Sequence, residues 1–211
     1  MADPDLGLIA VLVVAGFFSV WYYGAFLYSR RLAARVAREL KAAVLRLGGT
    51  SSIRWFGTTA FRMTTEGADP PFKEFSVTVT LRPREMPINW ALATAQGRRD
   101  SAVVEAALRK DPKVEFELVD PRTRLGKRRR RAKSEWSPLS LDGRSLLLGA
   151  DDEGRVQRLL ESLGPGTLAA VAGLHVTAGT APGIAASVSV EPGRAAQGIA
   201  AIRTLGVRLT D

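Results

Sequence analysis

The chain has 211 residues, of which 46% are hydrophobic, and carries a formal net charge of +9. It contains no cysteine and a single histidine. This composition excludes disulfides, thiolate metal sites, a cysteine nucleophile and any site that needs two histidines.

The first predicted element is an uncharged and mainly apolar stretch from Leu6 to Leu27. A helix of about 22 residues is about 33 Å long, because each residue adds about 1.5 Å. The hydrocarbon core of a bilayer is about 30 Å thick. The sequence therefore predicts a transmembrane helix over residues 6–28, and its aromatic residues Trp21, Tyr22, Tyr23 and Tyr28 lie toward the end that approaches one headgroup layer.

The charges on the two sides of this helix predict its orientation. Asp3 and Asp5 precede it, whereas Arg30 and Arg31 follow it at once. Basic residues favour the cytoplasmic side, so we expect residues 1–5 to be a short extracytoplasmic N-terminus and the rest to be cytoplasmic. A cleaved signal peptide would carry its basic residues before the apolar run. The expected protein is a single-pass protein of the cell membrane.

Residues 29–48 are predicted to continue as a basic juxtamembrane helix. An apolar stripe repeats at spacings of four and three and comprises Leu32, Val36, Leu40, Val44 and Leu47. Packing of this stripe on the following domain is favoured over contact with the membrane surface. Four arginines near the membrane are expected to contact lipid headgroups: Arg30, Arg31, Arg35 and Arg38.

The first half of the remaining chain reads mainly as strands. A hairpin or bulged strand is predicted around Gly57, and residues 75–82 alternate strictly between apolar and polar side chains. A short helix beginning with proline is expected over residues 87–96. Residues 101–110 are ambiguous, because their alanine and glutamate content favours a helix whereas their alternation favours a strand. We expect a strand that pairs with a second strand over 114–118 through a turn at 110–113.

The second half mixes both kinds of element. Asp142-Gly143 predicts a hairpin turn, and Asp151 or Asp152 is expected to cap a helix that Gly164 ends. Two further strands near residues 174 and 184–190 and a helix over 193–204 complete the chain. The expected fold class is α+β: antiparallel sheet with packed helices in a cytoplasmic domain over residues 50–211. This region forms one domain, or two subdomains (50–120 and 137–211) joined by a basic loop at 121–136.

The basic loop is the most charged segment outside the anchor. It has only basic charges between residues 122 and 133, at Arg122, Arg124, Lys127, Arg128, Arg129, Arg130, Arg131 and Lys133. Three interpretations remain open: a solvated loop without a partner, a contact with anionic lipid, or a contact with RNA or DNA through phosphates. Trp136 is close enough along the chain to stack on a base.

The sequence shows no catalytic constellation, and no cofactor or metal is expected. His175 lies alone in a predicted strand, and Asp151-Asp152-Glu153 is typical of a helix start rather than of magnesium ligands. The functional prediction is a non-enzymatic scaffold or accessory subunit that engages anionic lipid headgroups, with a membrane protein as a further partner. The alternative is a membrane-tethered module that binds nucleic acid or the ribosome.

Overall fold

The computed structural model describes residues 5–131, 136–191 and 193–210. Lys133 therefore lies outside the described residues. The elements in chain order are α1 (Leu6–Leu45), β1 (Thr50–Trp55), β2 (Ala60–Glu66), β3 (Phe72–Thr80), α2 (Pro87–Ala95), β4 (Ser101–Leu108), β5 (Phe116–Val119), α3 (Arg124–Arg131), β6 (Ser137–Leu141), β7 (Arg144–Ala150), α4 (Glu153–Ser162), β8 (Val171–Val176), β9 (Ile184–Ser189) and α5 (Arg194–Thr210).

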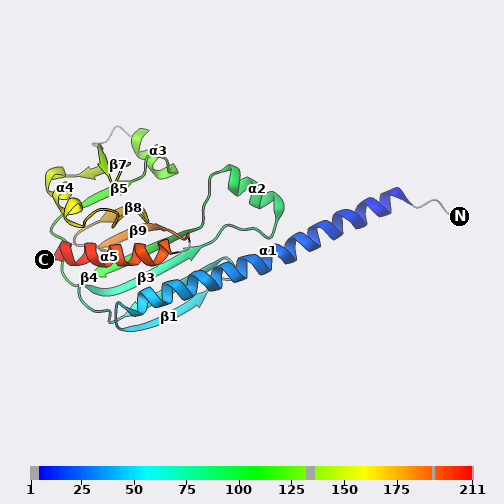
Figure 1. The fold of residues 1–211 in the computed structure, drawn as a ribbon, viewed down its shortest axis with the longest axis horizontal. Coiled ribbons are helices and arrows are strands. Elements are labelled where there is room, and N and C mark those ends of the chain that lie inside the picture. The colour runs from blue at the N-terminus through cyan, green and yellow to red at the C-terminus, as the bar shows by residue number, and fades with distance from the viewer. Residues whose placement is uncertain (1–4, 132–135, 192, 211) are drawn as a thin grey trace.

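The strands form one antiparallel sheet, which confirms the predicted α+β class (Figure 1). Their order is β1-β2-β3-β4-β9-β8-β5-β7-β6, and β4 pairs with β9 to join the two halves of the chain. The expected pairing of residues 101–110 with 114–118 is wrong, because β4 pairs with β3 and β9, whereas β5 pairs with β7 and β8. Alternation predicts a strand but carries no information about its neighbour.

The helix α1 has two halves with different surroundings. Asp5 caps its start by accepting a hydrogen bond from the Gly7 amide at 3.0 Å. Residues 6–20 are exposed, whereas a set of small and aliphatic residues in the second half is buried on the domain: Ser29, Ala33, Val36, Ala37, Leu40 and Val44. The prediction that the stripe of the juxtamembrane helix packs on the domain is thereby confirmed.

One face of the sheet carries α1, α4, α5 and the core. The helix α5 lies beside α1 and on β9 and β4, and α4 lies on β7. Gly198 of α5 faces Val188 of β9 so closely that a side-chain carbon at this glycine would collide with the valine. The opposite sheet face carries Ser76, Glu105 and Glu117, and α3 lies on this side, where Arg129 pairs with Glu117.

The segment expected to be a basic loop contains the helix α3. Thr123 precedes this helix and accepts a hydrogen bond from the Gly126 amide at 3.0 Å, as a helix-capping residue does. Gly126 lies against the Asp120 carbonyl, where no larger residue would fit. Arginine and lysine have good helix propensity, and the cap at Thr123 is the sequence signal that identifies this helix.

Candidate membrane-facing site

Several connections lie at the same end of the strands, and three of them bear on the candidate site. The pairs Thr80–Ser101 and Ser101–Ser189 align the end of β3 with the start of β4 and the end of β9. The turn between β1 and β2, the connection that carries α2, and the start of the α3 segment after β5 all lie at this end. Figure 1 shows α2 and α3 on the same side of α1, with α2 next to the part of α1 that leaves the domain.

The connection between β3 and β4 packs directly against the middle of α1. The Trp21 indole Nε1–H donates a hydrogen bond to the Arg84 carbonyl at 3.0 Å, and its ring lies 5.8 Å from the ring of Trp90 in α2. The Arg84 guanidinium lies 5.5 Å from the centre of the Tyr28 ring. These contacts place α2 beside residues 21–28 of α1, which belong to the predicted transmembrane segment.

Asp100 is the last residue of the connection between β3 and β4 and directly precedes β4. Its carboxylate accepts hydrogen bonds from the Arg82 amide at 2.7 Å and from the Arg84 guanidinium at 2.6 Å. Arg84 is 9% exposed, and it also donates to the Arg82 carbonyl. Asp100 also lies 3.7 Å from the Arg82 guanidinium, so its carboxylate pairs with two arginines and joins the start of the connection to its end.

Replacement of Asp100 by alanine is expected to lower the free energy of unfolding by about 1–3 kcal/mol, because a largely buried guanidinium loses its partner. Thermal or denaturant unfolding of the full chain in detergent measures this effect. Glu105→Ala is the matched control, since Glu105 pairs with Arg62 at 3.1 Å on an exposed surface and is expected to contribute less than about 1 kcal/mol. Equal losses in the two variants would contradict the structural role of Asp100.

The predicted juxtamembrane arginines are exposed but lie at different distances from the anchor. Arg30 and Arg31 directly follow the predicted transmembrane segment, whereas Arg38 lies about 15 Å beyond Tyr28 along α1. Charge interactions fade over about 8–10 Å at physiological salt. Arg30 and Arg31 thus lie within one helical turn of the predicted transmembrane segment, whereas Arg35 lies about 10 Å beyond Tyr28 along α1.

Sequence reasoning missed a second basic pair at this end. Arg98 and Arg99 follow α2 directly and are both exposed. The available signal was the uncharged stretch from Met86 to Gly97 that ends in two adjacent arginines.

The predicted basic residues around α3 divide into structural and exposed groups. Arg129 forms an ion pair with Glu117 at 3.0 Å and lies 5.6 Å from the centre of the Trp136 ring. Arg122, Lys127 and Arg128 are exposed. Arg124, Arg130 and Arg131 are residues of the helix α3. Arg129 is therefore engaged within the fold, whereas the exposed basic side chains remain accessible to an anionic partner.

His175 lies beside this cluster. The Nδ1 atom of His175 is 4.0 Å from the Glu117 carboxylate, which Arg129 also contacts. The His175 side chain is half exposed. Within residues 5–131, 136–191 and 193–210, no group of three or more His, Asp or Glu side chains could hold a metal ion.

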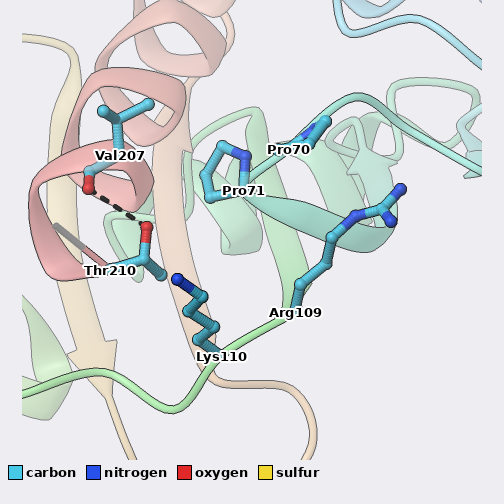
Figure 2. A pocket seen from close by; sticks show the side chains of 6 residues that line it. All are labelled: Pro70, Pro71, Arg109, Lys110, Val207 and Thr210. Atoms are coloured by element: carbon cyan, nitrogen blue, oxygen red, sulfur yellow. Dashed lines mark hydrogen bonds between the residues drawn. The ribbon is translucent and has the colours of Figure 1, made fainter.

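A pocket of about 390 Å³ lies at the other end of the domain (Figure 2). It is lined by Pro70, Pro71, Arg109, Lys110, Val207 and Thr210. The Arg109 guanidinium donates to the carbonyls of Phe72 and Ala68, both at 2.9 Å, so it holds the start of β3 in place. The lining groups form no acid–base or nucleophile pair.

A second apolar hollow lies between α1 and the edge strand β1 and has a volume of about 320 Å³. Ile53 and Trp55 of β1 line it and are about half exposed. Because β1 is the first strand of the sheet, its outer backbone edge has no neighbouring strand among the described residues.

A scan against models of known protein families found no match to this chain, and a search of curated proteins found no relative. The fold and the site define an α+β protein with one helix that is long and apolar enough to cross a membrane.

Proposed function

We propose that the chain is a single-pass protein of the cell membrane whose α+β domain lies in the cytoplasm. It acts without catalysis, as a scaffold or accessory subunit at anionic lipid. The continuity of α1 is the observation that carries this proposal. One uninterrupted helix joins an exposed apolar half to a half that is buried in the domain core.

The exposed half of α1 needs an apolar environment. Leu12 is 62% exposed and Val13 is 66% exposed, and every residue from Leu6 to Val20 is exposed. Contiguous exposed apolar surface of this extent is typical of membrane or protein contacts rather than of surfaces in water. A helix satisfies its own backbone hydrogen bonds, so it is able to cross lipid alone.

The buried half of α1 argues for an anchor that is retained. No proline occurs between Leu6 and Leu45, and the helix passes through Ser29 without a break. Residues from Ser29 to Val44 contribute to the core. Removal of the first half by a peptidase would therefore require cleavage within a continuous helix whose next turn is packed on the domain.

Charge supports a cytoplasmic domain. Arg30 and Arg31 are exposed directly after the apolar half, whereas Asp5 caps the other end of the helix. Basic residues close to the end of a span favour the cytoplasmic side. The exposed Arg98 and Arg99 add to this basic end.

Thiol labelling tests the topology directly, because the chain contains no cysteine and one introduced cysteine is the only thiol. In spheroplasts, Ala2→Cys is expected to react with a membrane-impermeant maleimide. Arg158→Cys, at an exposed position of α4, is expected to react only after permeabilisation. Labelling of Arg158→Cys in intact spheroplasts would overturn the proposed orientation.

The basic residues of α3 support contact with anionic lipid. Each Lys or Arg close to a cytoplasmic leaflet contributes about 1 kcal/mol, and the anchor keeps the domain near the bilayer. Figure 1 shows α3 set back from α2 but on the same side of α1. A tilt of about 20°, which is ordinary for membrane helices, toward this side would bring α3 nearer to the headgroups.

Hydrogen exchange of α3 amides tests this contact in vesicles that hold the full chain. Exchange is expected to be slower in anionic vesicles than in neutral ones. High salt is expected to restore the exchange rate in anionic vesicles to the rate seen in neutral vesicles. Replacing Arg128, Arg130 and Arg131 with glutamine, while Arg129 stays paired with Glu117, is expected to abolish the slowing. The control variant replaces three exposed arginines elsewhere in the domain with glutamine: Arg155, Arg158 and Arg203.

The same experiment separates the alternative partner. Protection of α3 by a mixed RNA pool in neutral vesicles, with a steep loss as salt rises, would favour a nucleic-acid or ribosome-binding module. Lack of protection by either lipid or RNA would leave α3 as a solvated helix and would contradict this part of the proposal.

The hollow between α1 and β1 supports a scaffold role. An edge strand with free backbone groups is able to accept a strand from another protein, and an adjacent apolar hollow gives side chains of that strand a place to pack. Arg38 and Lys41 border the hollow. A membrane protein with an extended cytoplasmic segment is the kind of partner that would fit this surface.

A further inference from the structure

We infer that α2 is a second membrane contact, which inserts into the headgroup layer and sets how close the domain sits to the bilayer. The inference rests on the proposed anchor α1. Its partner is the lipid bilayer itself.

The composition and exposure of α2 are unusual for a helix in water. No charged residue occurs from Met86 to Gly97. Ile88 is 70% exposed and Leu92 is 55% exposed, and these two residues are four positions apart on one helical face. Only Ala93 of this helix is buried. A helix of a domain surrounded by water normally turns charged side chains outward and apolar ones inward.

The position of α2 along α1 explains this reversal. Trp90 contacts Trp21, which lies about 10 Å before Tyr28, the last residue of the predicted transmembrane segment. If α1 spans the membrane, this contact therefore lies just below the headgroups, among the first acyl carbons. Interfacial helices bury their apolar face to a depth of about 5–10 Å, and Trp and Tyr prefer this layer.

The charges around α2 fit the same depth. Arg84, which reaches toward Tyr28, is neutralised by Asp100 at 2.6 Å. Arg98 and Arg99 follow α2 and are exposed, so they are able to reach lipid phosphates. Basic residues next to a short apolar helix strengthen its binding to anionic lipid.

Two neighbouring features extend the apolar surface. A groove of about 490 Å³ lies between α1 and the α2 connection, and its lining combines apolar residues, which include Val20, Trp21 and Trp90, with Arg82 and Arg84. Phe56 in the β1–β2 turn is 51% exposed, and Thr58 of the same turn donates to the Glu85 carboxylate at 2.9 Å. Lipid chains would fill the groove, and Phe56 would lie at the same membrane-facing end.

Depth-dependent fluorescence quenching tests the inference on the full chain in vesicles of neutral and anionic phospholipid. A single cysteine replaces Leu92 or, in a second variant, Ile88, and carries an environment-sensitive dye. A nitroxide on the lipid chain near the headgroup is expected to quench both dyes several-fold more strongly than it quenches a dye at Val207→Cys. Val207 is an exposed apolar residue at the other end of the domain.

A dye at Leu12→Cys distinguishes failure of the inference from failure of the anchor. If a nitroxide deep in the bilayer quenches Leu12 while Leu92 and Ile88 behave like Val207, the anchor stands and α2 is not a membrane contact. If Leu12 is also unquenched, the proposed anchor itself is wrong. Coverage of α2 by another protein or by a second copy would likewise leave Leu92 and Ile88 unquenched and would overturn the inference.

Discussion

A chain that begins after residue 47 is expected not to fold, although it keeps every strand of the sheet. Val36, Leu40, Val44 and Leu47 are almost completely buried in the common core. Burial of each Val or Leu side chain contributes about 1.5–3 kcal/mol. Their combined loss approaches the whole stability of a typical domain, which is about 5–15 kcal/mol.

The matched control removes only residues 1–27 and keeps the buried half of α1. The chain that begins at residue 28 is expected to unfold cooperatively on heating, whereas the chain that begins after residue 47 is expected to show no transition. Circular dichroism and limited proteolysis measure the difference. A cooperative transition of similar midpoint in both chains would show that the second half of α1 is dispensable for the fold.

Replacing Val14 with arginine is expected to reduce membrane integration by roughly a hundredfold. Val14 lies near the middle of the exposed apolar half of α1. An arginine at the centre of a membrane-spanning helix costs about 2.5–3.5 kcal/mol on scales measured by insertion. The fraction of protein that resists alkaline extraction from membranes measures this effect.

Val207→Arg provides the control for Val14→Arg. Val207 is an exposed valine as well, but it lies on α5 in the domain. This variant is expected to remain as strongly membrane-bound as the unaltered chain. If Val14→Arg also stays in the membrane fraction, α1 does not hold the protein there.

Local patterns were sufficient for many elements. The alternation from Phe75 to Leu81 predicted β3, and Asp142-Gly143 marked the hairpin of β6 and β7. Asp152 caps α4 as predicted, by accepting a hydrogen bond from the Arg155 amide at 2.9 Å. Each of these features depends on residues close together in the chain, so its physical cause is visible in the sequence.

Features that depend on distant residues could not be predicted in the same way. The neighbours of β4 and β5 follow from the global sheet order. The engagement of Arg129 requires Glu117, which lies on a different element. The hydrogen bond from Trp21 to Arg84 joins residues 63 positions apart, and together with the contacts of Trp90 and Tyr28 it places α2 beside the candidate anchor.

The order of residues along the chain is enough to predict where an apolar helix begins, where the basic charges lie and which segments alternate as strands. These properties arise from side-chain chemistry at short chain separation. The folded arrangement was needed to show that α1 is both a candidate anchor and part of the core, and which arginines are paired. Those outcomes depend on which surfaces meet when the chain closes on itself, because burial and pairing are properties of two distant segments together.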